Sequence, residues 1–313
     1  MKITQINGAR GLILKSSIKK IIIDSDIENA SAFKDIVITH LSLDTLNIIE
    51  NNSNQYRRIN LSYDLMLLLQ KLWRYNIIKK PNVMPKFRIL PSGYEATLGL
   101  EFKITAYDSD DGLPGSIAII IEDMSTGEKL GYVPNFITQG QHKNRIKKWK
   151  RAFRDAHLTQ FTSFNSNINK NTNLTNISYS EKKFKARVTE LLPETEKLKL
   201  FFSPFNPERL LEINKIATQN NYQIIWQPTT ANLLHYYFPN DDFYTTSDNS
   251  LEKDHLINVN KQELNENNLI QEQPNNLIAQ DLRNYLKIFR NTLPQSDFSD
   301  IIKMIHAQET YMI

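Results

Sequence analysis

A histidine and several carboxylates stand where they could hold a metal ion. His40 ends an apolar strand pattern and Asp44 follows four residues later, while Asp108, Asp110 and Asp111 fall in one acidic stretch. Several carboxylates meeting at one rim could bind a hard divalent cation such as Mg²⁺. The alternative is structural, because Asp and Gly are common turn residues and a histidine at a strand end commonly bonds to backbone.

A basic stretch in the middle of the chain could contact nucleic acid. It carries seven cations and no acid before Asp155. The cations are Lys143, Arg145, Lys147, Lys148, Lys150, Arg151 and Arg154. Clustered Lys and Arg release counterions when they neutralise a phosphate backbone, whereas the alternative is a merely solvated helix face. The spacing predicts that Trp149 and Phe153 face the core and are not stacking platforms.

The composition excludes several classes of chemistry. The chain has 313 residues, a net charge of +4 and no cysteine, so thiolate catalysis, thiolate metal sites and disulfides are absent. No stretch approaches the roughly 18 apolar residues that span a bilayer, and the first residues contain no continuous apolar segment. We therefore expect a cytoplasmic protein without a membrane partner.

Short β-rich runs separated by turn residues dominate the first half, and helical patterns interrupt them. Strands are expected within 1–7, 19–25, 35–40, 57–62, 86–90, 95–107, 116–123, 129–133, 157–164 and 222–228. Helices are expected over 61–79, with Ser62 as the cap, and over 144–156, 207–219, 277–293 and 297–307. Such interleaving indicates an α/β fold with helices and sheets around one core.

The order of four stretches resembles the metallo-β-lactamase fold, and within it the ribonuclease J-like nucleases that carry a β-CASP insertion. The stretches are IIIDSDIENA with Asp24, VITHLSLDTL with His40, YDSDDGLPGSIAIIIED leading into KLGYVPNFITQG, and FFSPFNPERLLEINKIATQNNYQIIW. They cover about residues 1–225. The resemblance implies an αββα four-layer sandwich and, in active members, zinc-dependent hydrolysis of nucleic acid.

The residues that would hold zinc are mostly missing. Against the family pattern, His40 and Asp44 keep two ligand positions, but Ser42, Thr45 and Asn135 stand at the places of two histidines and a bridging aspartate. No histidine lies between His40 and His142, so the histidine of the third motif is absent as well. Imidazole is the usual zinc ligand in such sites, so we expect no zinc, although another divalent cation on the remaining carboxylates stays possible.

The resemblance gives a division of the chain. We expect a metallo-β-lactamase-like domain over 1–195, a reduced β-CASP-like segment over 196–239, a flexible polar linker or insert over 240–276, and helices over 277–313. The chain is expected to be too short for a full insertion followed by a return to the sandwich. Either its last two helices replace the missing part, or it is a shortened relative.

Two functional hypotheses follow, one for each reading of the degenerate site. The first is a catalytically inactive relative that acts as an RNA-binding or partner subunit, with RNA or an active homologous nuclease as partner. The alternative is a hydrolase or nuclease with an atypical carboxylate-rich metal site built on His40, Asp44, Asp108, Asp110 and Asp111. A gene product with no retained role is the third hypothesis.

Asn206 and Arg209 could form a phosphate contact, but Asn-Pro-Glu-Arg is also a plain helix start.

Overall fold

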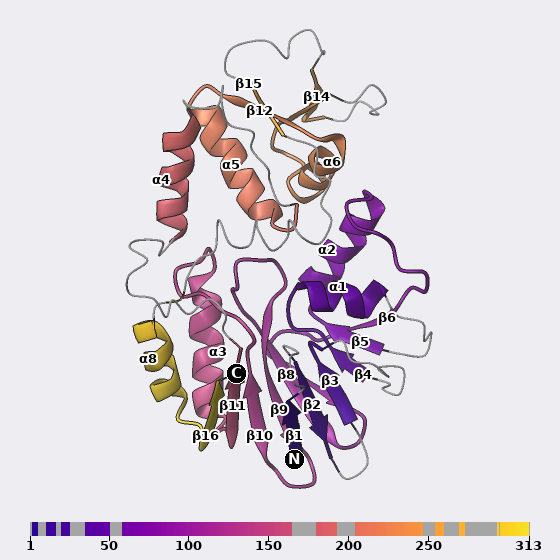
Figure 1. Cartoon of the computed structure of the whole chain (residues 1–313), viewed down its shortest axis with the longest axis vertical. Coiled ribbons are helices and arrows are strands. Elements are labelled where there is room, and N and C mark those ends of the chain that lie inside the picture. Colours follow the sequence, from indigo (N-terminus) through magenta and orange to yellow (C-terminus); the bar gives the residue numbers. More distant parts are fainter. Residues whose placement is uncertain are drawn as a thin grey trace. The chain divides into compact units, whose positions relative to one another are not determined.

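The computed structural model describes residues 2–5, 11–16, 20–25, 35–50, 58–164, 180–192, 204–246, 254–259, 269–272, 293 and 295–312 (Figure 1). The chain divides into two compact units, which are described separately here. Unit 1 consists of 1–69, 80–178 and 291–313, and unit 2 consists of 70–79 and 179–290. No helix in the described part of the chain is long and apolar enough to cross a membrane.

The first sheet of unit 1 has six strands in sequence order. They are β1 (Lys2–Gln5), β2 (Leu12–Lys15), β3 (Lys20–Ile23), β4 (Asp35–Val37), β5 (Arg58–Leu61) and β6 (Lys86–Ile89). The first three strands run antiparallel, and β3 to β6 run parallel. Parallel strands place their carboxyl ends at one edge, so the residues that follow β3 and β4 come together there.

The second sheet of unit 1 also has six strands, in the order β16-β11-β10-β9-β8-β7. They are β7 (Glu95–Leu98), β8 (Phe102–Asp108), β9 (Ile117–Asp123), β10 (Lys129–Tyr132), β11 (Gln160–Ser163) and β16 (Glu309–Met312). Strand β16 pairs in parallel with β11 and opposes Phe161 with Thr310. The end of the chain therefore does return to this sheet.

The two sheets pack face to face and share one core. Ile21 and Ile23 of β3 lie in the same buried cluster as Ile104 of β8 and Ile119 of β9. Ile22, between the first two, is also fully buried although it points to the opposite face. Continuous apolar strands of this kind are typical of sheets that are covered on both faces.

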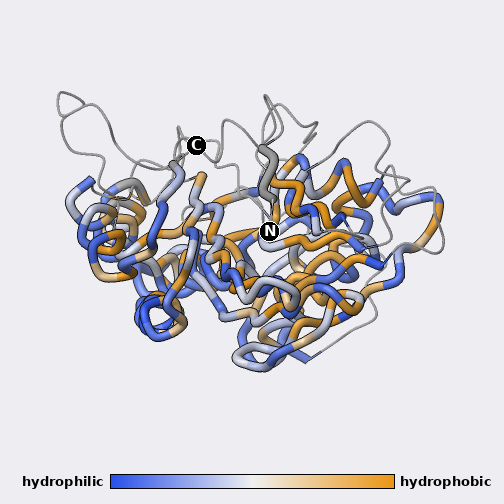
Figure 2. Tube along the Cα trace, turned by 90° about the horizontal axis from the view of Figure 1, so that it is seen from below, coloured by the Kyte–Doolittle hydropathy of each residue, from blue (hydrophilic) through white to orange (hydrophobic). Residues whose placement is uncertain are grey.

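Helices cover the outer faces of the sheets. Helix α3 (Lys143–Asp155) and helix α8 (Gln295–Ile305) pack on the second sheet, where Trp149 and Phe298 join Phe161 in a buried cluster. The predicted core role of Trp149 and Phe153 is confirmed, because both are fully buried. Figure 2 shows hydrophobic and hydrophilic residues interspersed along the chain trace.

Helix α1 (Leu43–Glu50) follows β4, and helix α2 (Tyr63–Arg74) follows β5, each with a buried apolar side that includes Ile48 or Leu68. The predicted cap of α2 is present, because the Ser62 hydroxyl accepts a hydrogen bond from the Leu65 N–H at 3.2 Å. Together with α3 and α8, these helices complete the four layers. The predicted metallo-β-lactamase-like αββα sandwich is confirmed for unit 1.

Unit 2 contains a four-stranded sheet in the order β14-β13-β12-β15. Its strands are β12 (Gln223–Trp226), β13 (Phe243–Thr245), β14 (Leu256–Asn258) and β15 (Leu269–Gln271), and all its pairs are parallel. Its helices are α4 (Glu181–Leu191), α5 (Pro207–Gln219) and α6 (Pro228–Tyr237). Residues from both kinds of element, such as Leu210 and Trp226, form its core.

The structure departs from the expected division at several points. The stretch 240–276, expected as a polar linker, contains β13, β14 and β15. These strands are only three residues long, so few apolar residues were needed to form them and their signal in the sequence is weak. The expected helix over 277–293 lies outside the described residues, and the expected helix over 297–307 is α8, which leads into β16.

Candidate functional site

Asp24 anchors the edge of the sandwich at the carboxyl ends of β3 and β4. It follows β3 in a left-handed conformation, with φ of 50°, and is 1% exposed. Its carboxylate accepts hydrogen bonds from the Thr39 N–H at 2.7 Å, from the Thr39 hydroxyl, and from the Tyr132 hydroxyl at 3.0 Å. Burial and the neighbouring Asp24 charge raise the pKa of Tyr132 well above its usual value, so this hydroxyl remains a donor. Asp24 thereby joins the two sheets.

His40 is buried beside this carboxylate. Its Nδ1 lies 3.5 Å from Oδ2 of Asp24 and 3.4 Å from the Thr39 hydroxyl. A carboxylate in this place orients the ring. This is the arrangement expected of a histidine held in a structural network at a strand end.

Ser42 caps helix α1, and Thr45 ties the first turn of that helix to the preceding loop. The Ser42 hydroxyl accepts a hydrogen bond from the Thr45 N–H at 3.1 Å, and the Thr45 hydroxyl donates to the carbonyl oxygen of His40 at 2.8 Å. The two hydroxyls are themselves 3.0 Å apart. The Ser42 oxygen satisfies one of the first N–H groups of the helix, and the Thr45 hydroxyl holds the loop before it, so both residues have a folding role.

The acidic loop between β8 and β9 bonds mainly to backbone. Asp110 accepts hydrogen bonds from the N–H groups of Gly112, at 3.0 Å, and His142, at 2.8 Å, and Asp111 accepts from that of Leu113 at 3.0 Å. Bonds to an N–H two residues ahead are typical of aspartate turns. The turn interpretation of this stretch therefore has direct support.

Both carboxyls of this loop hold their protons more tightly than usual. Burial raises the pKa of Asp110, although its two backbone donors and the charges of His142 and Arg145 oppose the shift. Burial also raises the pKa of Asp111 to about 6, with His40 opposing the shift and Asp110 adding to it. His40, Asp110 and Asp111 are thus electrostatic neighbours.

These residues do not fit a dinuclear zinc centre. In the described part of the chain, no group of three or more His, Asp or Glu side chains is placed to hold a metal ion. Residues His40, Asp44, Asp108, Asp110 and Asp111 all fall within that part. The donor set has one imidazole, and the Asp110 and Asp111 carboxylates accept backbone hydrogen bonds. The carboxylate-rich metal site therefore stays a prediction without a geometric counterpart.

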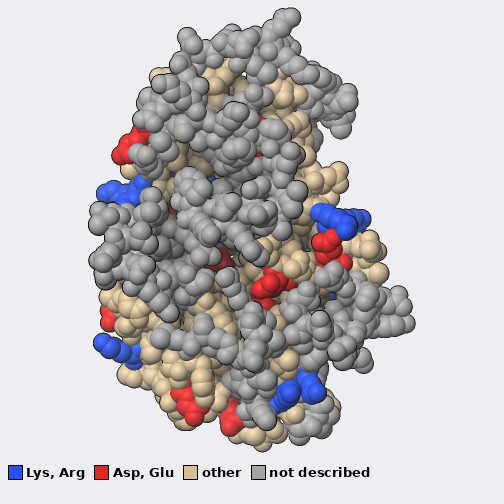
Figure 3. Space-filling view, in the orientation of Figure 1, with Lys and Arg blue, Asp and Glu red and all other residues tan. Residues whose placement is uncertain are grey.

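Helix α3 presents most of the predicted basic residues to solvent. The exposed members are Lys143, Lys147, Lys148, Arg151 and Arg154, while Arg145 and Lys150 are half-buried. Arg154 forms an ion pair with Asp155 at 2.8 Å. On the face drawn in Figure 3, the described cations lie in small separate groups.

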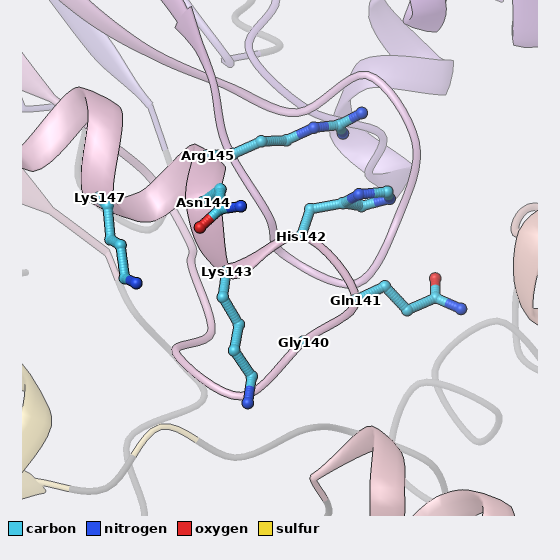
Figure 4. Close-up of a pocket in the computed structure, with 7 residues that line it drawn as sticks. All are labelled: Gly140, Gln141, His142, Lys143, Asn144, Arg145 and Lys147. Carbon is cyan, nitrogen blue, oxygen red and sulfur yellow. The ribbon is translucent and has the colours of Figure 1, made fainter.

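A cavity of about 380 Å³ opens at the start of α3. The described residues that line it are Gly140, Gln141, His142, Lys143, Asn144, Arg145 and Lys147. Lys143 and Lys147 extend toward one side, and His142 and Arg145 extend toward another (Figure 4). The lining combines three fixed positive charges with an imidazole and two amides, which suits an anionic oxygen-rich group.

Comparisons with known proteins give a fold. A crystal structure of a protein of unknown function from Enterococcus faecalis V583 aligns over 97% of this chain and 90% of its own, with a TM-score of 0.70 and 12% identity. No protein-family model matches the sequence, and neither does any curated protein. The likeness to the Enterococcus protein therefore shows a shared fold.

Partial matches, each over about half of this chain, are metallo-β-lactamase-fold proteins. The Rm3 metallo-β-lactamase aligns over 51% of this chain and 73% of its own, with a TM-score of 0.38 and 14% identity. The metallo-β-lactamase fold protein YhfI from Bacillus subtilis aligns over 50% and 62%, with a TM-score of 0.36 and 13% identity. Zn²⁺-bound PqqB from Methylobacterium extorquens aligns over 50% and 57%, with a TM-score of 0.36 and 7% identity.

Three residues of the site carry little signal in the sequence. In the sequence, Tyr132 has the pattern of an ordinary strand residue, and its hydrogen bond to Asp24 joins residues that are 108 positions apart. Gly140 and His142 precede the basic helix, and only the fold brings them to Asp110.

The sequence also offers Asn206 and Arg209 as a phosphate contact. The Asn206 side chain instead accepts from the Arg209 N–H at 3.0 Å as a helix cap, and the Arg209 guanidinium pairs with Glu181.

Proposed function

We propose that this chain is a metallo-β-lactamase-fold protein that binds RNA through the exposed face of α3 and does not hydrolyse it. The observation that carries the proposal is the row of exposed cations on α3. Lys143, Lys147, Lys148 and Arg151 are exposed, and in the described part of the chain none of these four pairs with an acidic side chain. A surface helix that only needs to be solvated usually interleaves such cations with acids.

The arrangement is costly without an anionic partner. Lys143 with Lys147 and Lys147 with Arg151 are like charges one turn apart, and such pairs destabilise a helix by about 0.2–0.5 kcal/mol each. A phosphate backbone turns this repulsion into a favourable term, because neutralised phosphates release their counterions. The net charge of +4 is small, so binding would be directed to this face instead of spread over the surface.

The residues at the family's ligand positions support the non-hydrolytic part of the proposal. Ser42 caps α1, the Thr45 hydroxyl donates to the carbonyl oxygen of His40, and Asn135 offers an amide where a bridging carboxylate is needed. An amide binds a dication weakly in comparison with a carboxylate. The proposed role is that of a cytoplasmic RNA-binding or partner subunit, with an active homologous nuclease as the partner that the ribonuclease J-like and β-CASP resemblance suggests.

The experiment is a salt titration of RNA binding by mobility shift. The test variant carries Lys148→Glu and Arg151→Glu, and the matched control carries Lys182→Glu and Lys183→Glu on α4, where both lysines are exposed. Loss of two phosphate contacts should lower the slope of log K against log salt by roughly 1.4 for a single strand. Unaltered binding in the test variant, or equal loss in both variants, would remove the assignment to α3.

A further inference from the structure

We infer that the cavity at the start of α3 is a phosphate subsite, which holds a single phosphate group between Lys143 and Lys147. This inference rests on the proposed RNA binding for the source of the phosphate, a phosphodiester of the bound strand. Free inorganic phosphate offers the same chemistry. The cavity, its charged lining and its fixed floor carry the inference.

The two lysines provide the charge. They stand one helical turn apart, both are exposed, and their side chains extend to the same side of the helix (Figure 4). Lysine binds phosphate as a point charge with three donors, so two ammonium groups can each bond to a different phosphate oxygen. The bound anion also removes their mutual repulsion.

The other residues that line the cavity distinguish anions more by shape than by charge. Burial raises the pKa of Asp110, and the charge of Arg145 opposes this rise, so part of the attraction of Arg145 for an anion is offset by that carboxyl. The amides of Asn144 and Gln141 offer neutral donors at the same cavity. About 380 Å³ lies in the range of small-ligand sites and admits a phosphate together with an adjoining sugar.

The floor of the cavity is held in place before any ligand arrives. The His142 N–H is bonded to the Asp110 carboxylate at 2.8 Å, and Asp110 is only 3% exposed. Gly140 lies so close that a Cβ there would stand 2.2 Å from Asp110 Oδ2. A site fixed in this way loses little conformational entropy on binding, and Asp110 is buried away from the anion.

The test measures binding of inorganic phosphate by ³¹P NMR titration of the full chain at constant ionic strength. The cavity variant carries Lys143→Ala and Lys147→Ala, and its matched control carries Lys182→Ala and Lys183→Ala on α4, where both lysines are exposed. The cavity variant loses two charge-assisted contacts, so we expect it to lose at least about tenfold in phosphate affinity, while the control changes less than about twofold. All side chains exchanged are on the surface or half-buried, and unchanged thermal midpoints verify folding.

A second arm separates this inference from the proposed function. A 5′-hydroxyl oligoribonucleotide is titrated against the same proteins. If RNA binds but phosphate affinity is equal in all three proteins, the subsite is overturned and the RNA proposal stands. If phosphate binding is lost only in the cavity variant while no protein binds RNA, the subsite stands with free phosphate as its ligand and the RNA proposal fails. Absence of phosphate binding to the unmodified chain overturns the subsite.

Discussion

The carboxylate of Asp110 accepts a hydrogen bond from the backbone N–H of His142, 2.8 Å away, and so ties the acidic loop after β8 to the start of the basic helix. The second oxygen of Asp110 accepts from Gly112. The loop between β8 and β9 thus helps to position the start of α3. Changes at this contact should affect the cavity and the stability of the loop together.

Gly140→Ala tests the closeness of this contact. A Cβ at position 140 would lie 2.2 Å from Asp110 Oδ2 and 2.7 Å from Ile137 Cδ1, so the loop must shift. Overpacking of this kind typically costs about 1–3 kcal/mol. We expect a loss of that size in the free energy of unfolding, measured with urea, and weaker phosphate binding at the cavity.

Gly127→Ala is the matched control for that substitution. Gly127 has φ of +72° and nothing within 4 Å of an added Cβ, so alanine there brings backbone strain and no collision. It should lower stability by about 1 kcal/mol and leave phosphate binding unchanged. Equal phosphate affinity in both variants would show that the Asp110 contact does not support the cavity.

Tyr132→Phe tests the link between the two sheets. The Tyr132 hydroxyl donates to Asp24 at 3.0 Å, and both residues are buried. Removing a donor to a buried carboxylate should cost about 1.5–3 kcal/mol. Tyr94→Phe, at a tyrosine that is 71% exposed, should change the free energy of unfolding by less than about 0.5 kcal/mol. Comparable losses for the two variants in urea denaturation would mean that Asp24 does not depend on this hydroxyl.

The sandwich could be predicted from the sequence because its strands are apolar and its motifs follow a known order. The expected helix over 207–219 coincides with α5, and the expected strands of unit 1 include all those observed except β2 and β16. Strand β16, Glu309–Met312, is at the end of the chain and its exposed residues give no apolar run. The strands of unit 2 within 240–276 are too short for periodicity to reveal them.

The site was predictable only in part. The sequence indicates which helix is basic, since this is a matter of residue type. It does not indicate that Ser42 caps α1 or that Asp110 bonds to His142, because such contacts depend on distances that the fold sets. The sequence predicts that the basic stretch contacts RNA, but the cavity beside this stretch could be found only in the structure.

Metal loading tests whether the chain binds a divalent cation. After incubation with Zn²⁺, Mn²⁺ or Mg²⁺ and dialysis, we expect substoichiometric metal by mass spectrometry, and no difference between the unmodified chain and Asp44→Ala. The physical reason is the donor set, which has one imidazole where zinc sites of this kind use several. Stoichiometric metal that disappears in Asp44→Ala would contradict this and would justify nuclease assays.

Glu272 should make the stability of unit 2 depend on pH. Its side chain is fully buried after β15, and its carboxylate accepts from the Gln227 N–H at 2.7 Å and the Thr230 hydroxyl at 3.1 Å. Burial raises the pKa of Glu272 from 4.5 to about 7, and these two donors only partly oppose it. Both donors are neutral and do not offset the cost of burying a negative charge, so the folded state favours the protonated carboxyl.

The sign of the effect follows from this difference in proton affinity. Between about pH 4.5 and 7 the folded state binds more protons than the unfolded state, so stability is highest below pH 4.5 and falls as the pH rises toward 7. A shift of this size corresponds to about 3 kcal/mol. Glu272→Gln keeps the shape without the charge, so it should be more stable than the unmodified chain at pH 8 and gain nothing at pH 4.5.

Urea midpoints at pH 4.5, 6, 7 and 8 measure the difference between Glu272→Gln and the unmodified chain, which cancels the contribution of other groups such as Asp111. Asp254→Asn, at an exposed carboxyl of the same unit, is the control and should give a difference that does not change with pH. If the Glu272→Gln difference is equally flat, then Glu272 is ionised throughout this range, and a cation or water near it must stabilise the charge.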